Sequence, residues 1–170
     1  TGRLSSNKPN FQNIPIKTDT GKEIRKAFIP QNDNHYIYSF DYSQIELRIL
    51  THFTNEPELL KAFNNEEDIH LRTASLIFGV SEDEVDNSKR QIAKTINYSI
   101  LYGAGPFRIS QELKIPIKDA AEIIKNYFIS YPQIKNYIDS TVAFGEKHGF
   151  VKTLNGRQRK VSNIYASNKN

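Results

Sequence analysis

Residues 57–149 carry a succession of amphipathic helical patterns separated by proline and glycine, and this succession most constrains the fold. Pro57 opens the first apolar run, a place that the first turn of a helix tolerates. The run 68–78 begins with Asp68, which can cap a helix, and stops before Gly79. Further helices are expected over 89–102, 107–113, 117–130 and 133–148.

A strand is expected directly before this helical region. Residues 36–40 are rich in aromatic side chains and include the β-branched Ile37, which favours a strand, and a helical apolar pattern begins near Ile45. Asp41 would then lie where a strand runs into a helix, a rigid position suited to a metal-binding carboxylate. A plainer interpretation is that Asp41 or Ser43 only caps the helix that follows.

The C-terminal part has the pattern of a β-hairpin. Residues 150–154 and 157–161 flank Asn155-Gly156, a pair that suits a type I′ turn. Strands at both ends of a helical region predict an α+β fold.

The charge is uneven along a chain of net charge +4. Residues 1–30 hold six Lys and Arg against two acids, and residues 147–170 hold six without an acid. Two basic ends could form a track for nucleic-acid phosphates, or they could be solvated surfaces. There is no cysteine, which excludes disulfides and thiolate metal sites, and no apolar run approaches the roughly 18 residues of a membrane span.

Two sets of side chains recur every four residues within 89–102. The isoleucines should pack inward: Ile92, Ile96 and Ile100. The second set lies about 200° away around the helix: Arg90, Lys94 and Tyr98. Two cations and an aromatic ring on one face suit a nucleoside triphosphate, although a solvated basic face has the same pattern. Tyr102 follows one turn later.

Residues 1–18 are rich in side-chain amides and turn formers. Pro9 and Pro15 exclude a regular helix. Three amides lie close in sequence to Arg3 and Lys17: Asn10, Gln12 and Asn13. Such a loop could hydrogen-bond a nucleic-acid duplex, or it could be an ordinary polar surface loop.

Three separated stretches together resemble one family. They are Thr1-Gly2-Arg3-Leu4-Ser5-Ser6 with the nearby 9–15, then Asp41-Tyr42-Ser43-Gln44-Ile45-Glu46-Leu47-Arg48, then the Arg90, Lys94, Tyr98, Tyr102 spacing that ends at Gly103. Their order and spacing are similar to those of family A DNA polymerases of the bacterial polymerase I type, and the resemblance extends over essentially all 170 residues.

The resemblance implies a partial palm with antiparallel strands and a mostly helical fingers subdomain. The expected divisions are a palm segment at 1–56, fingers at 57–149, and a basic hairpin returning towards the palm at 150–170. The implied activity is template-directed addition of deoxynucleotides to a primer 3′-hydroxyl, in DNA replication or repair. The implied partners are primer–template DNA, dNTPs and the rest of a polymerase chain. The implied location is cytoplasmic and nucleoid-associated if the source is bacterial; a phage or organelle origin is also open.

The resemblance also assigns the catalytic and metal-binding positions. Asp41 and the Tyr42 carbonyl match ligands of a site for two Mg²⁺ ions, and Lys94 matches a general acid for pyrophosphate. The family's second catalytic carboxylate belongs to a His-Asp-Glu strand that these residues do not include. We therefore expect the 170 residues alone to be inactive.

The remaining matched positions concern the nucleotide and the DNA. Contacts to the incoming nucleotide are expected from Gln44, Glu46, His70, Arg90, Lys94 and Tyr98. Among these, Glu46 would fill the space that a ribose 2′-hydroxyl needs. A lone helical histidine such as His70 is, taken by itself, more often structural. Contacts to primer–template DNA are expected from Arg3, Asn10, Gln12, Asn13, Lys17 and Tyr102.

The sequence departs from the family pattern at three positions of the 89–102 helix. Gln91 stands where a second Arg is frequent, and Ser99 where Gly is usual, which could alter the helix surface near the nucleotide. Tyr98 stands where many members have Phe, and its hydroxyl could replace the missing 3′-hydroxyl contact of a dideoxynucleotide.

Two other functions fit parts of the pattern. A non-catalytic DNA-binding remnant or split module would lack the downstream acidic strand. A single-subunit RNA polymerase shares the palm and fingers, but Glu46 argues against it, because a polymerase of ribonucleotides has no use for a side chain that blocks the 2′-hydroxyl.

Overall fold

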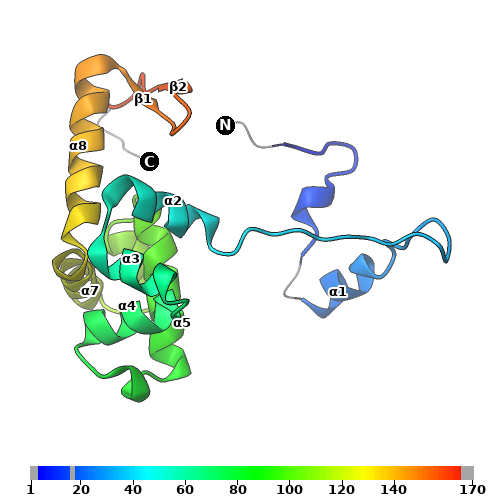
Figure 1. Ribbon diagram of the computed structural model, residues 1–170, viewed down its shortest axis with the longest axis horizontal. Helices are drawn as coiled ribbons and strands as arrows, with labels where there is room; N and C mark the ends of the chain where they lie inside the picture. Colours follow the sequence, from blue (N-terminus) through cyan, green and yellow to red (C-terminus); the bar gives the residue numbers. More distant parts are fainter. Residues whose placement is uncertain (1–3, 16–17, 166–170) are drawn as a thin grey trace. The chain divides into compact units, whose positions relative to one another are not determined.

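The computed structural model describes residues 4–15 and 18–165. The chain divides into two compact units, Thr1–Ser43 and Gln44–Asn170 (Figure 1). Arg3 and Lys17 lie outside the described residues.

The N-terminal unit contains a short 3-10 helix, η1 (Phe11–Asn13), and one helix, α1 (Asp19–Arg25). Thr18 caps α1 by accepting a hydrogen bond from the Gly21 amide at 3.1 Å. The Phe11 and Phe28 rings meet edge to face at 5.5 Å. Together with residues from 14 to 39 they line a hollow of about 370 Å³. The prediction that residues 1–18 form no regular α-helix holds for the described part of that stretch.

The expected strand over 36–41 is not formed. Tyr36, Tyr38 and Phe40 form a row of rings, with centroids 6.4 and 6.3 Å apart, as alternate residues of an extended chain do. Their side chains remain largely exposed. A strand needs a neighbour to bond its amides and carbonyls, and the described part of the chain supplies none for this segment. Local β preference was therefore insufficient.

The second unit is built from helices with clear local start and stop signals. They are α2 (Ile45–Thr54), α3 (Pro57–Asn64), α4 (Ile69–Phe78), the 3-10 helix η2 (Glu82–Glu84), α5 (Asn87–Leu101), α6 (Pro106–Leu113), α7 (Ile117–Ser130) and α8 (Pro132–His148). Proline opens α3, α6 and α8, and glycines in left-handed conformation end α4 and α8. The expected helices of 57–149 are confirmed.

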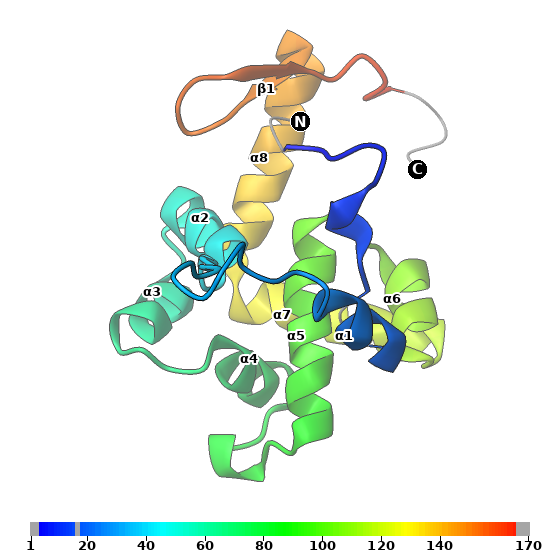
Figure 2. The same ribbon diagram turned by 90° about the vertical axis from the view of Figure 1, so that its right-hand side faces the viewer.

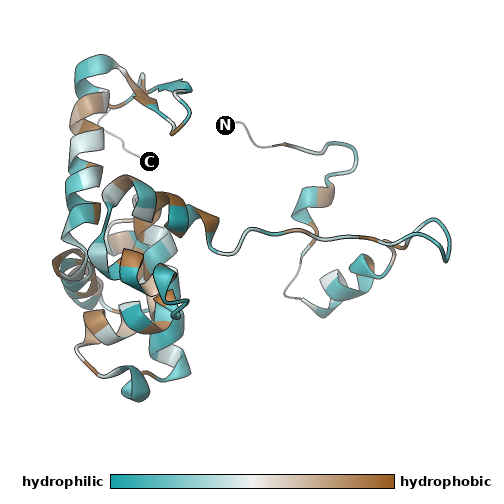
Figure 3. Cartoon of the chain, viewed as in Figure 1, coloured by the Kyte–Doolittle hydropathy of each residue, from teal (hydrophilic) through white to brown (hydrophobic). Residues whose placement is uncertain are grey.

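The core of this unit lies between helices that pack against one another, several of them far apart in the sequence. Helix α4 packs against α5 and α7, α6 packs against α7, and α2 packs against α8 (Figure 2). Each helix carries both hydrophilic and hydrophobic residues (Figure 3), and the hydrophobic ones converge. Ile96 and Ile100 are buried as expected, with Ile92 half-buried against the core. Burying an aliphatic side chain of this size stabilises the fold by about 1.5–3 kcal/mol.

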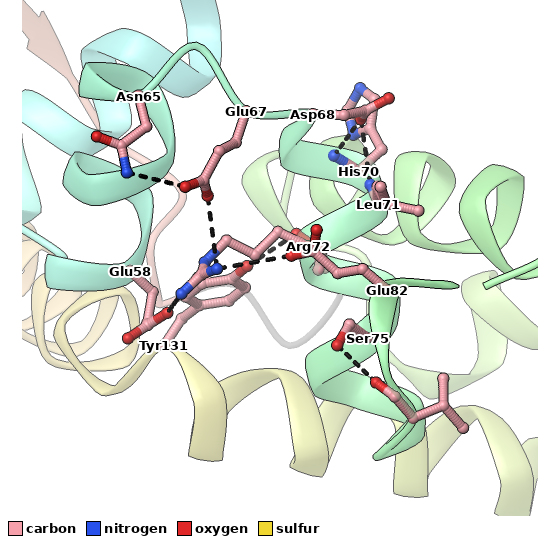
Figure 4. A network of polar contacts seen from close by, with 12 residues as sticks. Glu58, Asn65, Glu67, Asp68, His70, Leu71, Arg72, Ser75, Glu82 and Tyr131 are labelled. Carbon is pink, nitrogen blue, oxygen red and sulfur yellow. Dashed lines mark hydrogen bonds and ion pairs between the residues drawn. The ribbon is translucent and has the colours of Figure 1, made fainter. Parts of the chain in front are cut away.

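Two polar clusters tie the helices together. Arg72 of α4 forms ion pairs with Glu58 of α3, with Glu67 at 3.4 Å and with Glu82 of η2 at 3.6 Å (Figure 4). The buried carboxylate of Glu56 accepts a hydrogen bond from the Gln133 amide at 2.8 Å, which caps the N-terminus of α8 from 77 residues away. Burial raises the pKa of Glu56, although backbone hydrogen bonds to its carboxylate oppose the rise.

The C-terminal hairpin pairs β1 (Phe150–Lys152) with β2 (Gln158–Lys160) in antiparallel register, Val151 opposite Arg159. The expected type I′ turn at Asn155-Gly156 is wrong. The turn is closed by the Gly156 amide on the Thr153 carbonyl at 2.9 Å, and only Gly156 has positive φ. A turn centred on residues 154 and 155, followed by a glycine bulge, needs just one left-handed residue.

These helices and the two-stranded antiparallel sheet confirm the expected α+β class, in mostly helical form. In the described ranges, no helix is both long enough and apolar enough to cross a bilayer.

Candidate nucleotide-binding site

Helix α5 presents the predicted cations and aromatic ring along one side. Asp86 caps its start by accepting from the Lys89 amide at 2.8 Å, which fixes where the helix begins. Because the helix then runs unbroken to Leu101, Arg90, Lys94 and Tyr98 follow one another turn by turn. Lys94 is exposed, whereas Arg90 and Tyr98 are half-buried.

Arg90 is held by Asp68 of the α4 N-terminus. Its Nη2 and Nε lie 2.7 and 2.8 Å from Asp68 Oδ2. The other carboxylate oxygen, Oδ1, caps α4 by accepting from the amides of His70 at 2.9 Å and Leu71 at 3.1 Å (Figure 4). Burial opposes ionisation of Asp68, but the hydrogen bonds from Arg90 and the two amides outweigh it, so the pKa of Asp68 is lowered.

His70 is buried, with 3% of its surface exposed. Its Nδ1 lies 3.1 Å from the Asn97 side-chain nitrogen, which donates to it. Burial lowers the pKa of His70, and the positive charges of Arg90 and Lys94 lower it further against the opposing effect of Asp68. The imidazole is therefore neutral near pH 7, and its ring lies 5.9 Å from that of Tyr98.

A buried hydrogen-bond chain continues from His70 into the core. The Asn97 amide nitrogen donates to the Thr73 hydroxyl at 3.1 Å, and that hydroxyl lies 2.8 Å from the hydroxyl of Tyr131. All three side chains are almost fully buried. The chain joins α4, α5 and the residue before α8, and so fixes the rotation of α5 about its axis.

Glu46 and Tyr102 come together near the end of α5. The Tyr102 hydroxyl donates to Glu46 Oε1 across 3.4 Å, although 57% of the tyrosine surface is exposed. Glu46 also borders a hollow of about 220 Å³ that is lined mainly by apolar side chains of α2, α5 and α8. A carboxylate at the rim of such a hollow can restrict which polar groups enter it.

Gln44 is the N-cap residue of α2, in left-handed conformation at φ +54°, and its side chain makes no capping hydrogen bond. Such a conformation costs a non-glycine residue about 1–2 kcal/mol. The half-buried Gln44 side chain is thus not occupied by capping. The start of α2 at Ile45 places neither Asp41 nor Ser43 at the N-cap position.

Asp41 and Tyr42 belong to the N-terminal unit, and both are exposed. Carboxylate and carbonyl oxygens are ligands that Mg²⁺ prefers, so the donor chemistry fits one edge of a magnesium site. Across residues 4–15 and 18–165, no three acidic or histidine side chains converge into a metal-binding group. An octahedral Mg²⁺ ion would therefore need further oxygens from water, phosphate or other carboxylates.

Two side-chain amides of the N-terminal loop bond the backbone of the loop itself. Asn10 accepts from the Gln12 amide at 3.2 Å, and the Gln12 side chain donates to the Leu4 carbonyl at 2.9 Å. Asn13 is exposed. These bonds order the loop and leave the DNA contacts of the three residues as predictions.

Two of the departures from the family pattern occupy different surroundings. Gln91 is exposed. Ser99 is buried, and its hydroxyl donates to Glu112 of α6 at 2.9 Å, so it joins α5 to α6 instead of altering the exposed face.

Sequence reasoning did not find Asp68, Asn97 or Thr73 as parts of the site. The position of Asp68 before an apolar run identified it as a helix cap, but its pairing with Arg90 spans 22 residues. No local signal reveals such a contact.

The cations of the C-terminal segment remain exposed. From 147 to 165 the chain has no acid, and no ion pair involves its Lys and Arg residues within the described part of the chain. Lys152 lies 5.5 Å from the centre of the Phe150 ring.

Comparison with known proteins places the whole chain in one family. The family model for DNA polymerase family A matches residues 1–170. The chain is 46% identical over 170 residues to DNA polymerase I of Caldicellulosiruptor bescii, covering 100% of this chain and 20% of that protein. It is 47% identical over 169 residues to DNA polymerase I of Deinococcus radiodurans, covering 99% and 18%.

A solved structure agrees with these relatives. The polymerase domain of Pol1 from M. smegmatis, in complex with DNA primer-template and dNTP, is 37% identical, with a TM-score of 0.87 over 99% of this chain and 30% of that one. The chain spans about a fifth of the length of the curated relatives it matches. With its full-length match to the family model, this chain belongs to the family A DNA polymerases.

Proposed function

We propose that this chain is the nucleotide-binding part of a template-directed DNA polymerase, which adds deoxynucleotides to a primer 3′-hydroxyl in replication or repair. The observation that carries the proposal is the side of α5 on which Arg90, Lys94 and Tyr98 follow at one-turn spacing within a family A chain. A solved relative that holds primer-template DNA and dNTP supports this substrate class. Primer–template DNA, dNTPs and the remainder of the polymerase are the proposed partners.

Each residue of the α5 side has a distinct role in the proposal. Arg90 and Lys94 bind the triphosphate, and Lys94 also delivers a proton to the departing pyrophosphate. Tyr98 lies against the sugar and base, because its flat ring supplies a stacking surface. Tyr102 occupies the place that the templating base must enter.

Further contacts are proposed for residues of both units. Glu46 excludes a ribose 2′-hydroxyl, and Gln44 adds a polar contact to the nucleotide. His70 is buried, with its ring 5.9 Å from that of Tyr98, and its proposed contribution to the nucleotide site is made from beside Tyr98. Asn10, Gln12 and Asn13, with Arg3 and Lys17 outside the described residues, contact primer–template DNA.

Asp41 and the Tyr42 carbonyl would hold Mg²⁺ together with ligands from the rest of the polymerase. When bound, two Mg²⁺ ions supply activation of the primer hydroxyl and stabilise charge on the α-phosphate and the pyrophosphate. The exposed Asp41 carboxylate contributes one negative ligand to that arrangement. Because the relatives named above are bacterial proteins, we infer a cytoplasmic, nucleoid-associated location.

The test is single-nucleotide incorporation by the complete polymerase that carries these residues. Lys94→Ala should lower kcat at least 100-fold, because it removes both a phosphate contact and a proton donor. Lys89→Ala is the matched control, since Lys89 lies on the same helix but pairs with Asp86 at 3.3 Å. Equal effects of the two substitutions would contradict the proposed role of this face.

A second candidate, a DNA-binding module without catalysis, is favoured by the acid-free segment 147–165. It predicts salt-dependent DNA binding without any nucleotide incorporation by the complete protein. Incorporation that depends on Asp41 would exclude this candidate.

A further inference from the structure

We propose that Asp68 is a positioning residue that aims the Arg90 guanidinium at the triphosphate. The inference rests on the proposed function of Arg90 and extends it to a residue of another helix. Asp68 itself contacts no nucleotide in the proposal. It acts by holding the cation that does.

The geometry of Asp68 makes it a rigid support. Its Oδ1 is fixed by two backbone amides, those of His70 and Leu71, at the start of α4. The same carboxylate therefore cannot rotate freely when its Oδ2 receives Nε and Nη2 of Arg90. The long arginine side chain, which otherwise samples many rotamers, is thereby tied to the end of a helix.

The pairing leaves part of the guanidinium available. Arginine has five N–H donors in a planar fork, and the two bonds to Asp68 Oδ2 use two of them. Asp68 bonds one edge of the plane, so the donors on Nη1 point elsewhere, and no described residue bonds them. The Arg90 side chain is 39% exposed, and the exposed Lys94 lies one turn further along the same side. A triphosphate oxygen can therefore bind the remaining donors without displacing Asp68.

A positioning role and a purely electrostatic role of Asp68 predict opposite changes in the affinity for a triphosphate when Asp68 is removed. Its negative charge lowers the local positive potential, so a purely electrostatic role would make an anionic ligand bind more tightly without it. A positioning role predicts weaker binding, because the guanidinium would have to be ordered when the ligand binds. The pair is partly exposed at both ends, which limits its contribution to stability and leaves orientation as its main effect.

Measuring dNTP incorporation by the complete polymerase with Asp68→Ser tests this positioning role. Serine caps a helix about as well as aspartate but is too short to reach the guanidinium. We expect KM for dNTP to rise roughly tenfold with kcat changed less than about twofold. The matched control is Asp86→Ser, because Asp86 also caps a helix and pairs with a cation, but its partner is Lys89 and not Arg90. The control should leave KM within about twofold of wild type.

Two further variants separate the possible failures. Arg90→Ala should raise KM at least as much as Asp68→Ser, and the double variant should be no worse than Arg90→Ala. If Arg90→Ala leaves KM unchanged, the proposed function of Arg90 fails. If Arg90→Ala raises KM but Asp68→Ser leaves it unchanged or lowers it, the positioning role alone is overturned. If Asp68→Ser does not fold, Asp68→Asn is the second variant. Asparagine has one side-chain oxygen, so it cannot both cap α4 and accept from Arg90 as the carboxylate does. A KM for dNTP that is unchanged in this variant would overturn the positioning role.

Discussion

Replacing Thr73 with valine tests the buried hydrogen-bond chain that holds α4, α5 and the start of α8 together. Thr73 has no exposed surface, and its hydroxyl lies between the Tyr131 hydroxyl at 2.8 Å and the Asn97 amide at 3.1 Å. Valine has nearly the same shape and a similar helix propensity, so the substitution removes the hydroxyl with little change in packing. Its cost should therefore reflect the lost hydrogen bonds.

The expected loss in the free energy of unfolding is about 2–4 kcal/mol. A buried polar group that loses its partner costs about 1–3 kcal/mol. Burial raises the pKa of Tyr131 to about 12, so its hydroxyl stays protonated and needs an acceptor at neutral pH. The loss at Asn97 costs less, because its amide nitrogen keeps a second hydrogen-bond partner, His70 Nδ1, at 3.1 Å. One full loss and one partial loss give the stated range.

Urea denaturation of the chain at pH 7, followed by far-ultraviolet circular dichroism, measures this loss. Thr95→Val is the matched control, because Thr95 is a half-buried threonine on α5 whose side chain bonds no described residue. The control should change the free energy of unfolding by less than about 0.5 kcal/mol. A Thr73→Val variant within that same margin of wild type would refute the view that the chain of hydrogen bonds is stabilising.

Three other substitutions follow from the same structure. Burial lowers the pKa of His70 in the folded chain, so below pH 6.5 the unfolded chain binds a proton more readily and the free energy of unfolding of wild type falls. His70→Gln should remove this pH dependence, which urea denaturation at pH 5.5 and 7.5 measures. An undiminished pH dependence in the variant would contradict this. Glu56→Ala should cost about 2 kcal/mol through the lost α8 cap, whereas Glu56→Gln, which keeps an acceptor for the Gln133 amide, should cost less than about 1 kcal/mol; equal losses in urea denaturation would argue against capping. Tyr98→Phe in the complete polymerase should raise discrimination against dideoxynucleotides, because the hydroxyl that could replace their missing 3′-hydroxyl is lost; an unchanged ratio of deoxy to dideoxy incorporation would rule that contact out.

The hairpin and the 36–41 segment show where local patterns were insufficient. An Asn-Gly pair suits more than one turn, and the pairing of Val151 with Arg159 placed the turn one residue earlier than expected. The aromatic row at Tyr36, Tyr38 and Phe40 has the alternation of a strand but no partner among the described residues. Strand formation depends on a neighbour that local sequence does not specify.

The helices of the second unit and the residues that α5 presents could be predicted from the sequence, whereas α1 of the N-terminal unit was not. The helix starts at Pro57 and after Asp68 and the stop at Gly79 are local events, because caps and breakers act within one turn. Helical periodicity alone also separated the isoleucines of α5 from Arg90, Lys94 and Tyr98.

Which of these side chains act together depends on how the helices pack. Asp68 meets Arg90 across 22 residues, Asn97 meets His70 across 27, and Tyr131 meets Thr73 across 58. Such pairs form because the helices pack at particular angles and depths, which fixes the burial and hydrogen-bonding needs of each side chain. That information is distributed over the whole core and is absent from any single stretch of sequence.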